Sequence, residues 1–182
     1  FHNWEGSSEI HGVYVDACLQ RGRARARASQ HRQALEDYAA AVEYPENLEV
    51  GRPHRDRRAA VIQYFMARAH AALGETDRAQ ALFAQAVERL DHSPSETAYW
   101  QAKALEPLGK TAEARGIFNQ LVAQGKSRQT AGETADYFAK FGERQSERVR
   151  QAQGHFLEGL GHAGLGRAAE ARAAFARAVE LH

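Results

Sequence analysis

The chain has 182 residues, of which 26% are charged, and its formal net charge is +1 at pH 7. This balance excludes a globally basic protein that would bind nucleic acid through charge alone. The sequence shows no apolar run of membrane-spanning length and no signal segment, so we expect a cytoplasmic protein. Cys18 is the single cysteine, and the lack of an internal disulfide fits a reducing compartment.

Helical periodicity extends through most of the chain, and no stretch alternates between apolar and polar residues over a useful length. The clearest unit is the stretch 60–94, which predicts two amphipathic helices joined by a tight turn. Its first half ends at Gly74, because a glycine just past the last apolar position is typical of a helix C-terminus. Its second half places Ala79, Phe83 and Ala86 on one face of a helix.

This unit occurs four times, each time as an alanine followed four residues later by an aromatic residue. A glycine or alanine stands twelve residues before each alanine, where a small side chain lets a neighbouring helix approach while the aromatic ring fills the space beside it. The alanine–aromatic pairs are Ala34 and Tyr38, Ala79 and Phe83, Ala114 and Phe118, and Ala171 and Phe175, and the small residues are Gly22, Ala67, Ala102 and Gly159. Leu-Gly marks the predicted turn in three units, and Ala28-Ser29 holds that place in the first.

The shared pattern resembles the tetratricopeptide repeat (TPR) over about residues 8–182. The resemblance implies an all-α fold, namely an α-α superhelix (TPR-like solenoid) of right-handed sense with about four helix pairs plus an extra helix in the last insert. We expect one domain over residues 1–182. The predicted repeats are about 15–47, 60–94, 95–124 and 148–182, with an insert at about 125–147.

The repeats are not evenly spaced, because their alanines lie 45, 35 and 57 residues apart, whereas the family period is about 34 residues. The first excess contains Pro45, Gly51 and Pro53, which make a continuous helix there unfavourable. The second excess is long enough for an extra helix around Thr134 to Lys140, whose aromatic residues we expect to pack on the last repeat.

An alternating run of arginines follows Gln20 in the first repeat. On a helix such a run splits into two pairs spaced four apart, Arg21 with Arg25 and Arg23 with Arg27. One pair is therefore free to lie on a solvated surface while the other faces a groove. A nucleic-acid role is not favoured, since aromatic residues do not interleave with the run.

Two groups of side chains suggest metal ligands but match no ligand spacing. The first group consists of His2, Glu5, Glu9 and His11. In the second group, His155 and His162 lie seven apart on one side of a helix, without further ligands. We expect His162 to be a core histidine, and we predict neither a metal nor any other cofactor.

Two glycine motifs resemble nucleotide-binding signatures, and the repeat register accounts for both. The run 104–111, ALEPLGKT, would need a preceding strand to form a phosphate loop, but a predicted helix precedes it. The run 159–164, GLGHAG, has the spacing of a dinucleotide motif but lies inside a predicted helix, which suggests close helix packing. No nucleophile and base pair stands out, so the sequence predicts that the chain is not an enzyme.

In the first helix of each pair, an aromatic residue (replaced by Leu19 in the first pair) and a cationic residue (replaced by Leu160 in the fourth) share one face, because they stand four apart around the small residue. In TPR proteins these positions face a concave groove that holds a peptide or a partner's helix. The resemblance therefore implies a partner-binding site. Its residues are Arg23, Tyr64, Arg68, Tyr99, Lys103 and Phe156.

Cationic groups beside aromatic rings suit an acidic or C-terminal segment of a partner protein. The predicted function is thus a protein–protein interaction scaffold that binds a peptide or partner segment in the groove. The competing interpretation is that the aromatic side chains only pack between adjacent helices. The asparagines of the family's carboxylate clamp are missing, which speaks against a chaperone-tail partner.

A second resemblance concerns the segments 43–53 and 136–143. They are similar to the C-terminal helical region of large bacterial proteins whose earlier part is β-rich and carbohydrate-enzyme-like. This resemblance implies an accessory module whose partner is an upstream domain of the same polypeptide. Binding to nucleic acid is the least favoured alternative, and no membrane partner is predicted.

Overall fold

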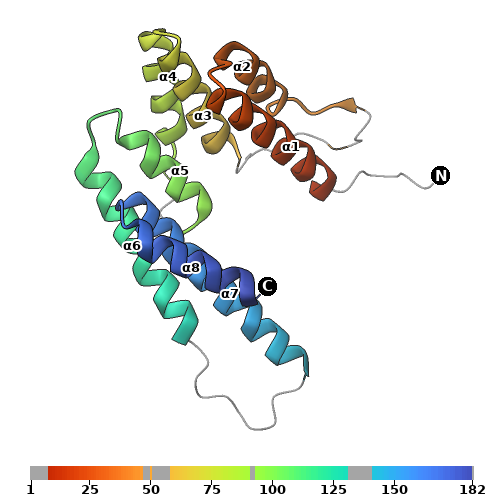
Figure 1. The fold of residues 1–182 in the computed structure, drawn as a ribbon, viewed down its shortest axis with the longest axis vertical. Coiled ribbons are helices and arrows are strands. Elements are labelled where there is room, and N and C mark those ends of the chain that lie inside the picture. Colours follow the sequence, from red (N-terminus) through yellow and green to blue (C-terminus); the bar gives the residue numbers. More distant parts are fainter. Residues whose placement is uncertain (1–7, 47–49, 51–57, 91–92, 131–140, 182) are drawn as a thin grey trace, which may run out of the picture. The chain divides into compact units, whose positions relative to one another are not determined.

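The computed structural model describes residues 8–46, 50, 58–90, 93–130 and 141–181. Over this part of the chain it consists of α-helices joined by turns, without a strand (Figure 1). The helices are α1 (Ser8–Arg27), α2 (His31–Ala40), α3 (Ala59–Ala72), α4 (Thr76–Val87), α5 (Glu96–Leu105), α6 (Thr111–Thr130), α7 (Phe141–Gly164) and α8 (Ala168–Leu181). The predicted all-α helical repeat fold is confirmed. None of the described helices is both long and apolar enough to cross a membrane.

The helices form two compact units, Phe1–Glu88 with α1 to α4 and Arg89–His182 with α5 to α8. In the first unit, α3 packs against both α1 and α2, and α4 packs against α3. In the second unit, α7 packs against both α5 and α6, and α8 packs against α7. Each unit therefore contains two successive helix pairs in the arrangement of neighbouring TPR units. The single domain and the right-handed superhelix remain predictions.

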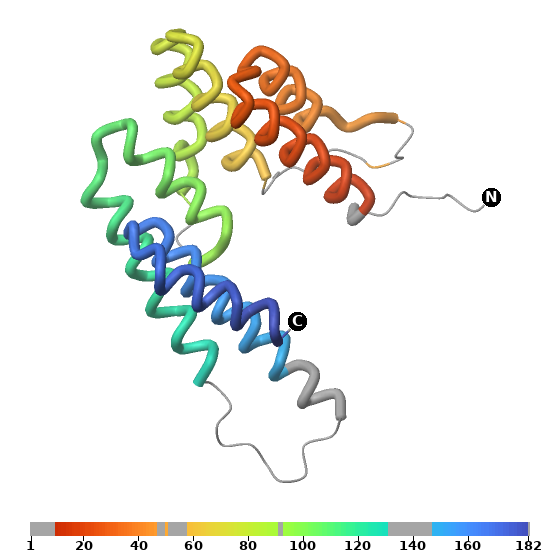
Figure 2. Tube along the Cα trace, in the orientation of Figure 1, coloured from red at the N-terminus to blue at the C-terminus, as the bar shows by residue number. Residues whose placement is uncertain are grey.

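The turn inside each pair is the same and is short, as the tube in Figure 2 shows. Ser29, Gly74, Gly109 and Gly166 have φ values of 60°, 78°, 78° and 76°. The amide of the next residue donates to a carbonyl five residues earlier, with N···O distances of 2.9 to 3.1 Å. This pattern is the Schellman motif, which satisfies carbonyl groups at a helix C-terminus. The predicted turn positions are thus confirmed, including Ser29.

Within each pair, the small residue of the first helix meets the aromatic ring of the second. A methyl group at Gly22 would lie 2.3 Å from the Tyr38 ring, and one at Gly159 would lie 2.5 Å from the Phe175 ring. The alanines at the same places in the other pairs, Ala67 and Ala102, are fully buried. The repeat register is therefore correct in all four pairs.

The α6 and α7 helices are longer than the predicted repeats, which placed an insert at about 125–147. The α6 helix continues to Thr130, and α7 begins at Phe141. The reason lies at Gly125, where a methyl group would meet the Glu158 amide and the Gly154 carbonyl at 2.6 Å. The insert was predicted from the long spacing between Ala114 and Ala171, whereas this glycine allows two helix backbones to touch.

Some sequence predictions fall outside the described residues. They are the extra helix around Thr134 to Lys140 and the metal-like group formed by the side chains of His2, Glu5 and Glu9 with His11. His11 itself is buried, and its Nε2 lies 3.0 Å from the Glu43 carbonyl. Its ring stacks on Tyr44 with the ring centroids 3.8 Å apart, so His11 packs α1 against the segment after α2.

Candidate partner-binding surface

The alternating arginines of α1 divide between two faces of the helix, as their spacing predicts. Arg21 and Arg25 both reach Asp37 of α2, with N···O distances of 2.6 and 3.1 Å. Asp37 is 2% exposed and would be costly to bury without these partners. This arginine pair therefore joins α1 to α2 and is committed to a structural role.

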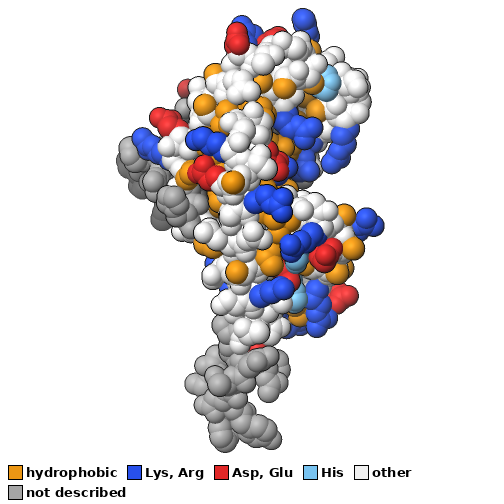
Figure 3. Space-filling view, turned by 90° about the vertical axis from the view of Figure 1, so that its left-hand side faces the viewer, with side chains coloured by type: hydrophobic (Ala, Val, Ile, Leu, Met, Phe, Trp, Pro, Cys, Tyr) orange, Lys and Arg blue, Asp and Glu red, His pale blue; other side chains and the backbone are white. Residues whose placement is uncertain are grey.

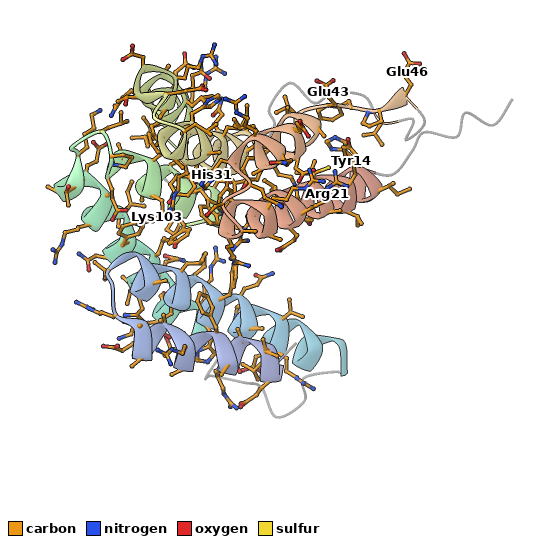
Figure 4. The ribbon with its side chains drawn as sticks, turned by 45° about the horizontal axis from the view of Figure 1, so that its top comes forward. Tyr14, Arg21, His31, Glu43, Glu46 and Lys103 are labelled. Atoms are coloured by element: carbon orange, nitrogen blue, oxygen red, sulfur yellow. The ribbon has the colours of Figure 1, made fainter. Side chains whose placement is uncertain are left out.

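Tyr14 lies on the same side of α1 as Arg21 (Figure 4). Burial raises the pKa of the Tyr14 hydroxyl, and the nearby Cys18, including its hydrogen bond with Tyr14, acts in the same direction. Arg21 lowers this pKa and Glu43 raises it, so all four groups lie close together. They belong to the packing of α1 on α2 and the segment after it.

The other arginine pair faces away from Asp37. The Arg23 guanidinium carbon lies 5.2 Å from the centre of the Phe65 ring of α3, a cation–π contact. Burial raises the pKa of the Tyr38 hydroxyl; the charge of Arg23 lowers it, that of Asp37 raises it, and those of Arg68 and Arg27 lower it by less. The charges of three arginines from α1 and α3 thus act on one buried hydroxyl, together with the carboxylate of Asp37. We call Arg23, Arg27 and Arg68 the arginine cluster.

The arginine cluster has an excess of positive charge. Within the described part of the chain, none of its three guanidinium groups forms an ion pair with a carboxylate. Arg27 and Arg68 are exposed, and Arg23 is partly exposed. Opposite charge from outside the unit would relieve their mutual repulsion, so this surface suits an anionic group.

The remaining predicted site residue of the first unit, Tyr64, is 5% exposed. Its ring lies between Phe65 and Phe83, with centroid distances of 5.3 and 6.0 Å. Tyr64 therefore packs the α3–α4 pair, as the competing interpretation of the aromatic residues predicts. Arg23 and Arg68, by contrast, both act on the Tyr38 hydroxyl through their charges.

In the second unit, the predicted residues are half-buried to exposed. The Tyr99 ring lies 5.8 Å from Phe118, and the Phe156 ring lies 6.0 Å from Phe175. Phe156 is nevertheless 39% exposed. Lys103 (Figure 4) forms an ion pair with Glu106, the residue directly after α5, so part of its charge is already neutralised.

The sequence did not assign Arg27 or Phe65 to the partner site. Arg27 had a usable signal, because it stands four residues from Arg23 and shares its face. Phe65 had no such signal. Adjacent residues of a helix point in different directions, and nothing in the sequence distinguished Phe65 from Tyr64 as the aromatic residue of the site. Only the contact with Arg23 identifies Phe65 as the ring at this surface.

Neither nucleotide-like motif has the geometry of a nucleotide site. The run 104–111 begins with the last two residues of helix α5, and its Gly109 is the turn residue before α6. The run 159–164 is helical, and a methyl group at Gly161 would lie 2.6 Å from the Phe118 carbonyl and 2.6 Å from Cγ2 of Val122. Gly109 therefore serves the turn and the glycines of 159–164 serve helix packing, as expected.

His155 and His162 lie on either side of Glu158, with N···O distances of 3.6 Å each. Gln129 of α6 donates to the same carboxylate at 2.8 Å. The predicted core position of His162 is confirmed, since it is 7% exposed. Among the described residues, no group of three or more His, Cys, Asp or Glu is placed to hold a metal ion.

The surface drawn in Figure 3 carries both signs of charge. Lys and Arg side chains stand there singly or in small groups among hydrophobic and neutral ones, with carboxylates between them. This distribution matches the net charge of +1. Positive charge is thus a local property of small clusters on this face, which suits a short anionic segment better than a nucleic-acid backbone.

One family model matches a part of the chain. The family model described as "Tetratricopeptide repeat" matches residues 96–127, which span α5 and most of α6. No curated protein matches the chain. Among solved structures, the chain is similar to a mutant of MamA, with 16% sequence identity, a TM-score of 0.34, and coverage of 97% of this chain and 100% of that chain.

The matched repeat and the four helix pairs support a TPR protein, and proteins are accordingly the partners to expect. The predicted resemblance to the helical region of carbohydrate-enzyme-like proteins is not addressed by any of these matches. It stays a prediction.

Proposed function

We propose that this chain is a protein-interaction scaffold whose arginine cluster binds an acidic or C-terminal segment of a partner protein. The observation that carries the proposal is the placement of Arg23 over Phe65, with Arg27 and Arg68 acting on the same Tyr38 hydroxyl, while the carboxylate that acts there, Asp37, is paired with Arg21 and Arg25. A carboxylate would accept charge-assisted hydrogen bonds from these groups.

Phe65 gives the surface an apolar component. Because Arg23 already lies over the Phe65 ring, its guanidinium is held in place before a partner arrives. A side chain held in place loses less conformational entropy on binding than a free one. We therefore expect affinity to depend on Phe65 as well as on the arginines.

The six predicted site residues divide between the two units, and the share of each unit is proposed by itself. In the first unit, Tyr64 is the proposed anchor, and Arg23 and Arg68 steer the partner. In the second unit, Tyr99 and Phe156 are the proposed anchors, and Lys103 steers the partner. Because Tyr64 is buried, we expect it to contribute less to partner binding. The 39% exposure of Phe156 supports a contact with the partner in the second unit. Two sets of variants separate these contributions.

The experiment titrates a fluorescently labelled acidic peptide with a free C-terminal carboxylate and follows its anisotropy. For the double variant Arg23→Glu/Arg68→Glu we expect binding to weaken by about tenfold or more, since two attractive contacts become repulsive. For Phe65→Ala we expect a smaller loss. Binding to the unchanged chain should weaken with added salt, because the contacts are charged.

The matched control is Lys110→Glu/Arg115→Glu, which makes the same change in net charge at exposed positions of the second unit. If it weakens binding as much as the double variant of the cluster does, the attraction is non-specific. The variant Tyr99→Ala/Phe156→Ala tests the anchoring residues of the second unit. Undiminished binding in all of these variants would refute the proposed surface.

A further inference from the structure

The arginine cluster takes its side chains from equivalent places on two neighbouring helices. Arg23 and Arg27 stand one turn apart on α1, and Arg68 of α3 holds the place in its pair that Arg23 holds in the first pair. Because α3 packs against α1, the three arginines belong to one side of the first unit.

The carboxylate that acts on the Tyr38 hydroxyl together with the cluster is already neutralised. Asp37 pairs with Arg21 and Arg25, and it is 2% exposed. Arg25 also donates to the Gln33 carbonyl at 3.1 Å, which fixes its position between the two helices. Two guanidinium groups thus compensate one carboxylate, and Asp37 has no negative charge left over for the arginine cluster.

One arginine of the cluster is held in place, and the other two reach solvent. The Arg23 guanidinium carbon lies 5.2 Å from the centre of the Phe65 ring, and Arg23 is partly exposed. Arg27 and Arg68 are exposed, so their guanidinium groups are free to turn toward a ligand beside Arg23. Such a ligand would receive N–H donors from three side chains of two helices.

A single carboxylate uses only part of this donor capacity, because it carries one negative charge on two oxygens. A phosphate monoester carries a charge of about −1.5 to −2 at neutral pH and three acceptor oxygens. The planar N–H groups of arginine also match pairs of phosphate oxygens. In charge and in number of acceptors, a phosphate therefore fits three arginines better than one carboxylate does.

We propose that the preferred ligand of the arginine cluster is a phosphoserine in the bound partner segment, with Arg23, Arg27 and Arg68 donating hydrogen bonds to its phosphate oxygens. This inference rests on the function proposed above and names the anionic group that the segment carries. Phosphorylation of the partner would then control binding, because an unmodified serine offers no charge to the arginines.

The experiment compares four labelled peptides that differ only at their centre, which is serine, glutamate, two adjacent glutamates or phosphoserine. Each peptide is amidated at its C-terminus, so that no terminal carboxylate takes part. We expect the phosphoserine peptide to bind about tenfold more tightly than the glutamate peptide, and the serine peptide to bind most weakly. The peptide with two glutamates should also bind more weakly than the phosphoserine peptide, because it spreads a similar charge over two side chains.

The variant Arg27→Gln tests the role of the third cation. It should weaken binding of the phosphoserine peptide by about tenfold and that of the glutamate peptide by less, because one carboxylate does not need all three arginines. The control Arg115→Gln removes the same charge at an exposed position of α6 and should leave the preference for phosphoserine unchanged. Both positions are exposed, so circular dichroism should show an unchanged helix content.

Equal binding of the phosphoserine peptide and the peptide with two glutamates would overturn this inference and leave the proposed function intact. A preference for phosphoserine that survives Arg27→Gln would overturn the assignment of the phosphate to the arginine cluster. Displacement of the peptide by an equal concentration of free phosphoserine would show that the site takes a small phosphate compound rather than a protein segment. If no acidic peptide binds, including the one with a free C-terminal carboxylate, the proposed function is wrong as well.

Discussion

Ser29 is the residue with a side chain that takes a positive φ, 60°, among the described residues, at a place where the other three turns have glycine. A side chain in this left-handed region costs about 1–2 kcal/mol relative to glycine. We expect Ser29→Gly to raise the free energy of unfolding by about 1 kcal/mol, measured by urea denaturation. The control Ala24→Gly lies inside α1 and should lower it by about 0.5–1 kcal/mol. An equal effect of both variants would contradict the turn geometry.

Glu75 stands directly after the turn residue Gly74, and its carboxylate accepts hydrogen bonds from His70 and Arg78. The hydrogen bond with His70, 2.8 Å long, lowers the pKa of Glu75 below its ordinary value of 4.5, and Arg78 adds to the effect. A lowered pKa in the folded state stabilises the fold above the unfolded-state value, and this contribution is lost as the pH falls through the folded-state value.

We therefore expect Glu75→Gln to be less stable than the unchanged chain at neutral pH. The difference should shrink as the pH falls below 4.5 and Glu75 becomes protonated. Thermal unfolding at a series of pH values measures it. A difference that stays constant down to acidic pH would show that Glu75 acts through packing rather than through charge.

At the scale of the helices, α6 contains two glycines with opposite surroundings. A methyl group at Gly125 would meet backbone atoms of α7 at 2.6 Å, whereas one at Gly116 would find nothing within 4 Å. We expect Gly125→Ala to lower the free energy of unfolding by about 1–3 kcal/mol, because the helices must separate. Gly116→Ala should raise it by about 0.5–1 kcal/mol, because alanine favours helix. Denaturant midpoints that move in the same direction would contradict this account of the α6–α7 contact.

The helix pairs could be predicted because their signals are local. An alanine and an aromatic residue four apart, a small residue twelve before them and a turn glycine occur within one pair, and they identified the contacts of Gly22 with Tyr38 and Gly159 with Phe175. The α6–α7 contact at Gly125 could not be predicted in this way, since its partners Gly154 and Glu158 follow a long insert.

The partner surface was predictable only in part. Helical spacing separated the α1 arginines into two pairs, but which pair would meet Asp37 depends on the rotation of α2 against α1. The burial of Tyr64 depends likewise on the position of Phe83 in the next helix. Periodicity assigns a residue to a face of its own helix, whereas exposure is decided by the neighbouring helix.

At the scale of the whole chain, the expectation of one domain stays a prediction that unfolding experiments test. In a repeat array, stability comes from each pair and from its contacts with the next pair. Because all four pairs keep one register, we expect residues 1–182 to unfold as one cooperative system. In that case, the units before and after Glu88 do not fold independently.

Phe83→Ala is the variant that tests this coupling. Phe83 is 5% exposed in the first unit, so its removal should cost about 3–5 kcal/mol. If the units are coupled, the amides of α6 and α7 in the second unit lose protection from hydrogen exchange together with those of α3 and α4. If only α1 to α4 lose protection, the chain consists of two folding domains. Phe118→Ala makes the reciprocal change in the second unit, where Phe118 is fully buried. It should lower the protection of the α3 and α4 amides only if the units are coupled.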